Sequence, residues 1–222
     1  PAFTLPAKAS PRERWLTRSE VARLLLAAWR NERTRHVARL ILIGIYQGRR
    51  PGAILALGWL PSPRAGHFDL DAGLLYGTGR RERGTGEAGQ RVTKKRAPTS
   101  RIHGRLLPHL KRWRAKDLER GIPHVIHYQG GRINKLRRSW RRAADLAGLG
   151  AEVTPHILRH TAGTWQAQAG TPDHEAAGFM GMSVEIYQRT YAHHHPDYQN
   201  KASTAQGTPR ITPRKQRNQR RT

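Results

Sequence analysis

Start and stop signals for helices run along most of this sequence, and they constrain the fold more than any other feature. Thr17 and Glu20 have the spacing of a capping box, in which the hydroxyl and the carboxylate satisfy free amides at a helix start. Apolar residues then recur at helical spacing, and a second periodic segment over 34–47 ends at Gly48. Proline at the start of 51–57 favours a short third helix.

Short strand signals interrupt the helices in the middle of the chain. Residues 67–70 and 74–76 are separated by Asp71-Ala72-Gly73, which predicts an antiparallel hairpin. Beyond it we expect a mobile basic loop and then short strands, at 77–90, 91–94, 99–102 and 124–127. The sheet is therefore expected to be small.

Helices return in the second half of the chain. They are expected at 106–120, 132–147, 154–169, 172–180 and 184–191. Thr154 is the predicted N-cap of the third of these, with Pro155 in its first position. The fold class is thus α+β and mostly α-helical. We interpret 1–14 as a linker, 15–198 as one domain and 199–222 as a basic, disordered tail.

Charge is the strongest global signal. Lys and Arg number 41 against 15 Asp and Glu, which gives a formal net charge of +26. Only seven of these bases lie in 200–222, so the excess belongs mainly to the folded part. Such a surface favours a polyanionic partner, because Lys and Arg release the counterions of phosphates.

Cysteine is absent, which excludes disulfides and thiolate metal sites. No segment approaches the ~18 apolar residues of a membrane helix, and no apolar signal-peptide core precedes residue 15. We therefore expect a cytoplasmic protein without a membrane partner.

His156, Arg159 and His160 form the first candidate site. On a helix, His156 and Arg159 share a face, and His160 lies one turn beyond His156. Arginine can hold two phosphate oxygens in a fork, and histidine can donate to one or move a proton. Alone, this pattern is more often a basic surface beside a structural histidine.

Three other positions change that balance. Arg50 follows a helix end and precedes an apolar segment, where a side chain can point into a cleft. Lys94 stands at the foot of the second expected strand pair. Tyr191 lies near the end of a short helix and is followed by Ala192 and His193.

Together these segments resemble the catalytic domain of the tyrosine recombinase (phage integrase) family. QGRRPGAILAL resembles the family's first arginine box with Arg50 in the arginine place. TKKRAPTSRIH matches the lysine hairpin in spacing with Lys94, and HILRHTAGTW closely matches the second box with His156 and Arg159. RTYAHH resembles the nucleophile box, with Tyr191 as the nucleophile.

The resemblance implies an integrase-type catalytic domain that cleaves and rejoins DNA through a 3′-phosphotyrosine. Arg50 and Arg159 would stabilise charge on the phosphate, His156 would assist proton movement at Tyr191, and Lys94 would protonate the leaving 5′ oxygen. The bond energy is retained in the intermediate, so neither ATP nor a metal cofactor is implied.

The same resemblance implies partners: double-stranded DNA of a mobile element, self-association into a tetrameric synapse, and an N-terminal DNA-binding domain that is missing from this chain.

Two positions depart from the family pattern. Met182 occupies the place of a histidine or tryptophan that supports the phosphate, and methionine cannot donate that hydrogen bond. A weaker phosphate clamp is expected there, although His160 could supply a donor or serve as a structural brace. Ala53 replaces a glutamate of structural importance.

Alternatives remain at the level of both site and function. Tyr187 and Tyr198 compete with Tyr191, but Tyr187 is interpreted as a core contact and Tyr198 falls near the tail. The run His193-His194-His195 could bind a metal, yet adjacent side chains splay apart, so no metal site is expected. The rival functions are a catalytically weakened DNA-binding module of the same fold, a type IB topoisomerase-like DNA relaxer and, more distantly, an RNA-binding protein.

Overall fold

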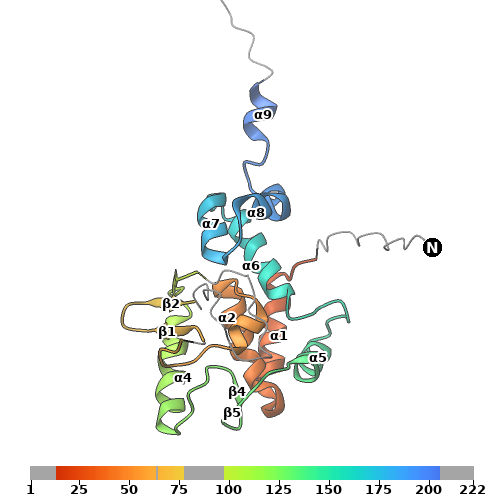
Figure 1. The fold of residues 1–222 in the computed structure, drawn as a ribbon. Helices are drawn as coiled ribbons and strands as arrows, with labels where there is room; N and C mark the ends of the chain where they lie inside the picture. The colour runs from red at the N-terminus through yellow and green to blue at the C-terminus, as the bar shows by residue number, and fades with distance from the viewer. Residues whose placement is uncertain (1–13, 64, 78–97, 206–222) are drawn as a thin grey trace, which may run out of the picture.

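Helices α1 (Arg18–Arg30) and α2 (Arg35–Gln47) pack against each other in the computed structural model, which describes residues 14–63, 65–77 and 98–205 (Figure 1). Both helices begin and end close to the expected residues. The other elements, in chain order, are η1 (Glu32–Thr34), α3 (Pro51–Leu55), β1 (His67–Asp69), β2 (Leu74–Tyr76), β3 (Ser100–Arg101), α4 (Leu107–Glu119), β4 (His127–Tyr128), β5 (Gly131–Arg132), α5 (Arg137–Leu146), α6 (Ile157–Gln168), α7 (Asp173–Met180), α8 (Val184–Tyr191), η2 (Ala192–His194) and α9 (Asn200–Ala205).

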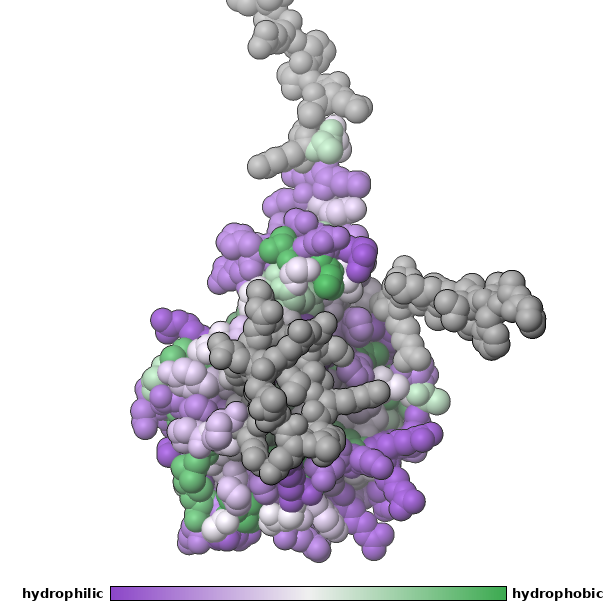
Figure 2. All heavy atoms as spheres, viewed as in Figure 1, coloured by the Kyte–Doolittle hydropathy of each residue, from purple (hydrophilic) through white to green (hydrophobic). Residues whose placement is uncertain are grey.

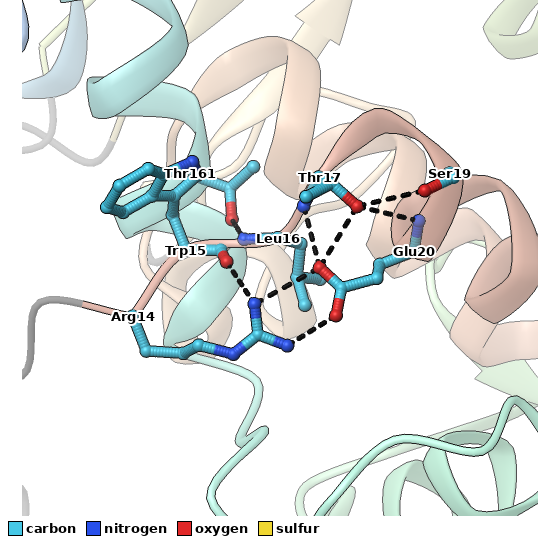
Figure 3. A network of polar contacts seen from close by, with 7 residues as sticks. All are labelled: Arg14, Trp15, Leu16, Thr17, Ser19, Glu20 and Thr161. Atoms are coloured by element: carbon cyan, nitrogen blue, oxygen red, sulfur yellow. Dashed lines mark hydrogen bonds and ion pairs between the residues drawn. The ribbon is translucent and has the colours of Figure 1, made fainter.

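The start of α1 is fixed by a polar network (Figure 3). The Thr17 hydroxyl accepts from the amide of Glu20 at 3.2 Å, and Glu20 accepts from the amide of Thr17 at 2.8 Å, so the predicted capping box is confirmed. A hydrogen bond from Arg14 lowers the pKa of Glu20 to about 2. The amide of Leu16 donates to the Thr161 hydroxyl at 2.9 Å, which ties this segment to α6.

Close packing of α2 on α6 depends on Gly44. A Cβ atom at this position would lie 2.8 Å from Cδ1 and 3.0 Å from Cβ of Leu158, so the Leu158 side chain or one of the two helices would have to shift. Val37, Leu40 and Ile41 fill the same interior and are fully buried, as the helical periodicity predicts. The end of α2 is therefore held beside α6.

The core consists of two apolar clusters joined by α6. The larger cluster collects side chains from α1 to α6 and the sheet, including Ile157 and Leu158. The smaller cluster lies among α6, α7 and α8, which form the upper part of the molecule in Figure 1. Its buried members are Ala167, Ala176, Ala177, Met180, Tyr187 and Tyr191.

The sheet is small and antiparallel, in the order β1-β2-β3. Phe68 pairs with Leu75, which in turn pairs with Ser100. The first hairpin is thus confirmed, and the strand expected at 99–102 is present as β3. Its expected partner at 91–94 lies outside the described residues, as does almost all of the loop expected at 77–90.

A buried ion pair joins α4 to the amino-terminal half of α2. Arg39 donates to both carboxylate oxygens of Asp117, at 2.5 and 3.0 Å. Asp117 also accepts from Nε1 of Trp59 at 3.0 Å and contacts Nε2 of His127 at 3.1 Å. Burial raises the pKa of Asp117, but the hydrogen bonds of His127 and Arg39 outweigh it, and the pKa is lowered overall.

Three local expectations differ from the structure. Thr154 is not an N-cap, because residues 154–156 first form a turn and α6 begins at Ile157 without a side-chain cap. α5 begins at Arg137 and not at 132, because the chain at 131–132 pairs with β4 in a second hairpin. A helix, α9, occupies the start of the segment expected to be a disordered tail.

The view in Figure 2 is largely hydrophilic, in keeping with the charge of the sequence. None of the helices in the described ranges is both long and apolar enough to cross a membrane.

Candidate active site

A left-handed glycine turns the chain sharply after α2. Gly48 has φ 59°, and its amide donates to the carbonyl of Gly44 at 3.0 Å. A larger residue would be strained in this conformation, and its Cβ would lie 3.1 Å from Cγ of Met180. The turn places Arg49 and Arg50 immediately beyond the helix, and Arg50 precedes α3 as its N-cap residue.

Arg159 reaches this turn from α6. It is 7% exposed, and its Nη1 donates to the carbonyls of Gly48 and Met180, both at 2.7 Å. Its Nη2 is buried and has no hydrogen-bond partner within the described part of the chain. Because a buried donor without a partner is costly, Arg159 is suited to an added oxygen ligand.

Among the described residues, no carboxylate forms an ion pair with the arginines of this region. Burial, followed by the charge of Arg50, lowers the pKa of Arg159 to about 10. Burial and Arg50 also lower the pKa of Arg49 to about 10. Arg49 and Arg159 therefore remain cationic at neutral pH. We call Arg49, Arg50 and Arg159 the arginine cluster. Such a concentration of positive charge attracts an anion.

Tyr191 is the last residue of α8, and the charge of Arg159 acts on its hydroxyl. It is 3% exposed, and its hydroxyl is 3.3 Å from Nδ1 of His160. Burial raises its pKa, while the charge of Arg159 lowers it. The net shift is upward, so the hydroxyl is protonated at neutral pH and needs an acceptor for its proton.

The Tyr191 ring packs directly against a glycine of α6. A Cβ atom at Gly163 would lie 2.6 Å from Cζ of Tyr191. The neighbouring Tyr187 is fully buried, and its hydroxyl donates to the Gly163 carbonyl at 3.2 Å. Tyr187 is therefore the core contact that we expected, whereas Tyr198 is 49% exposed beyond η2.

The remaining candidates lie at different depths. His156 is exposed at the start of α6, and its carbonyl accepts from the Arg159 amide at 3.1 Å. Met182 is half-buried against the cluster that contains Tyr191, and its amide donates to the Ala177 carbonyl at 3.0 Å. Lys94 lies outside the described residues.

The histidine run near the C-terminus packs against aromatic neighbours. The ring of His194 meets that of Trp15 edge-on, with centroids 4.6 Å apart, and the rings of His193 and His194 are 4.0 Å apart. In the ranges that the structure describes, no group of three or more His, Asp or Glu side chains is arranged to hold a metal ion.

Sequence reasoning missed two residues of this region, Arg49 and Gly163. Arg49 was recognisable as a second arginine directly after a helix-ending glycine, but its burial could not be inferred from that position. Gly163 lies within the HILRHTAGTW segment, where a glycine in a helix signals close approach of another element.

Comparisons with known proteins agree with this geometry. A family model described as the phage integrase family matches residues 91–197. A search of curated protein sequences found no significant match.

Solved structures share the fold at low sequence identity. A XerA recombinase is 20% identical with a TM-score of 0.59, and the match covers 93% of this chain and 68% of the XerA chain. The catalytic domain of bacteriophage HP1 integrase is 19% identical with a TM-score of 0.55, covering 85% and 92% respectively. The Tn1549 transposon integrase is 16% identical with a TM-score of 0.65, covering 90% and 67%. Residues 91–197 thus match the phage integrase family, and the described part of the chain shares the fold of these solved recombinases and integrases.

Proposed function

We propose that this chain is a site-specific recombinase that cleaves one strand of double-stranded DNA with Tyr191 and then rejoins it. The observation that carries the proposal is the position of Tyr191, whose hydroxyl meets His160 and whose charge state is coupled to Arg159. A tyrosine beside a cationic cluster is suited to attack on a phosphodiester.

The reaction balances without an external energy source. The Tyr191 oxygen forms a bond to phosphorus, the bond from phosphorus to the 5′ oxygen breaks, and a 3′-phosphotyrosine remains. Arg50 and Arg159 stabilise the added negative charge on the non-bridging oxygens. Attack by a 5′-hydroxyl reverses these steps and rejoins a strand, so the proposal includes neither ATP nor a metal.

Two protons must move during cleavage. His160 is the observed partner of the Tyr191 hydroxyl and orients it. His156, one turn before Arg159, assists removal of the tyrosine proton, and Lys94 protonates the leaving 5′ oxygen. Met182 adds apolar contact and no donor, so the phosphate is held by the arginines.

DNA is the substrate in solved proteins of the same fold. The Tn1549 integrase was solved in complex with circular intermediate DNA, and XerH in a post-cleavage complex with its palindromic difH substrate. The proposal extends this chemistry to the present chain. It also includes assembly into a tetrameric synapse and cooperation with an N-terminal DNA-binding domain.

A suicide substrate tests the proposal directly. A nick close to the cleavage position lets the short 5′-hydroxyl product diffuse away, which traps the enzyme on the DNA. Because the recombination site is unidentified, the probe is a pool of nicked duplexes from the flanks of the element that encodes the chain. We expect a covalent adduct at a 3′ end, resistant to boiling in detergent. DNA binding without any adduct would instead support the weakened DNA-binding module.

A further inference from the structure

The side chain of Arg49 is buried and reaches the sheet. It is 5% exposed, and its Nη2 donates to the carbonyl of Pro98 at 2.6 Å and to the hydroxyl of Ser100 at 2.7 Å. Ser100 belongs to β3, so this guanidinium joins the turn after α2 to the edge of the sheet.

This arrangement is energetically expensive for a purely structural contact. The acceptors of Arg49 are neutral, its Nε is buried with no partner in the described ranges, and Arg50 adds like-charge repulsion. Burying a cation without a carboxylate costs several kcal/mol, so a methionine or leucine would fill the same volume at lower cost. Residues that lower stability in this way are concentrated at functional sites.

The segment that Arg49 secures is the one that presents Arg50. On one side the Gly48 carbonyl is held by Arg159, and on the other side Arg49 is held by β3. No side-chain cap stabilises the start of α3 at Arg50. The Arg50 guanidinium forms no hydrogen bond with another residue in the described part of the chain, so its position depends on the backbone that carries it.

We propose that Arg49 is a positioning residue for the cleavage reaction: its bonds to Pro98 and Ser100 fix the turn at Gly48 and thereby aim Arg50 at the scissile phosphate. The inference rests on the proposed function. Arg49 does not touch the substrate itself, because its head group is buried against β3. Its effect on cleavage passes through Arg50.

A double-mutant cycle on the full chain tests this coupling. Single-turnover cleavage of a suicide substrate is measured for wild type, Arg49→Met, Arg50→Met and the double variant at saturating DNA. We expect Arg49→Met to slow cleavage by on the order of 10- to 100-fold with little change in DNA affinity, the loss typical of a small misplacement. In the Arg50→Met background the same change should cost less than about threefold, because the group that it aims is gone.

Arg39→Met is the matched control, since it also removes a largely buried arginine but in the distant Asp117 pair. Its effect should be the same with and without Arg50. Arg49→Lys should recover part of the rate, because the lysine ammonium can donate to the same acceptors but lacks the rigid planar head group that Arg49 packs between the turn and β3. Ser100→Ala, which leaves the Pro98 bond intact, should give a smaller loss of the same kind and serves if Arg49→Met does not fold.

A scissile methylphosphonate gives a second readout. It replaces one charged phosphate oxygen by methyl, so the penalty of Arg49→Met should shrink if Arg49 acts through the phosphate clamp. Equal penalties in both Arg50 backgrounds, or no penalty at all, would overturn this inference while a wild-type adduct leaves the proposed function intact. Absence of a wild-type adduct on the cognate DNA would overturn both.

Discussion

Near its amino-terminal end, α2 carries Arg39, which is paired with the buried Asp117. Just beyond its carboxyl-terminal end lie Arg49 and Arg50, and neither forms an ion pair with a carboxylate of the described residues. The first arginine is part of a closed network in which Trp59 and His127 also contact the acid. The arginine cluster instead contains a donor, Nη2 of Arg159, that has no hydrogen-bond partner among the described residues. The same residue type thus closes an ion pair near one end of α2 and contributes to a concentration of positive charge beyond the other end.

This difference predicts that variants sort into two groups. Changes in the Asp117 network should alter the free energy of unfolding and leave the chemistry of the folded protein alone. Changes near the arginine cluster should alter cleavage and leave stability nearly unchanged, or even increase it. The following expectations test that separation from the largest effect to the smallest.

Tyr191→Phe should abolish covalent attachment to DNA while DNA binding and folding persist. The phenyl ring keeps its seat on Gly163 and loses only the 3.3 Å contact with His160. Adduct formation on a suicide substrate measures the effect. Tyr187→Phe is the matched control: it removes a buried hydrogen bond, lowers stability by about 1 kcal/mol and keeps the adduct. The reverse result would assign the nucleophile to Tyr187.

Asp117→Ala should lower the free energy of unfolding by about 3–5 kcal/mol, because it leaves Arg39 buried without its partner. Urea denaturation measures this loss. The pKa of Asp117 is lower in the folded state, so its contribution to stability is complete above the ordinary aspartate range and disappears as pH falls through the lowered pKa. Below about pH 4 the wild type should therefore approach the variant. Asp145→Ala, which removes an exposed acid, should match wild type throughout.

Arg50→Met should abolish stabilisation of the protein by sulfate. In the wild type, sulfate at ten times its dissociation constant should add about 1.4 kcal/mol, because it offsets the repulsion within the arginine cluster. Without sulfate, the variant should equal or exceed the wild type in stability. Thermal melts at matched ionic strength, with chloride as the reference salt, separate site binding from general salt effects. If sulfate stabilised both proteins equally, the arginine cluster would not be the anion-binding site.

Met182→His should leave stability little changed and maintain or raise the cleavage rate, by less than about tenfold. Met182 is half-buried at the edge of the smaller cluster, so a histidine can be accommodated and can donate to the phosphate in the transition state. The gain should appear in the single-turnover rate and not in DNA affinity. A large loss of cleavage by a folded variant would show that the thioether is required for packing.

Local signals determined which parts of this fold were predictable. The capping box at Thr17 and the helix end at Gly48 depend on neighbouring residues, and both were found from sequence. The start of α5 was misplaced because Gln129 and Gly130, with φ 51° and 83°, turn the chain into a hairpin. Positive φ at a glutamine has no clear sequence signal.

The candidate site was predictable as a list of residues and not as a set of contacts. Each of the sequence boxes around Arg50, Arg159 and Tyr191 is a continuous stretch of residues, so it can be recognised without a structure. The contact of Tyr191 with His160 depends on how α8 lies on α6, which side-chain packing decides. The burial of Arg49 depends likewise on β3, which is some fifty residues distant in the chain.

The absence of a side chain at Gly163 determines where the ring of Tyr191 can lie. The position of the Tyr191 ring is determined by α6, whereas the tyrosine itself belongs to α8. One methyl group on that helix would occupy the space of the ring and evict it from its seat. A substitution at Gly163 alone would therefore move the Tyr191 ring to a new position while all the proposed reacting residues remain in the sequence.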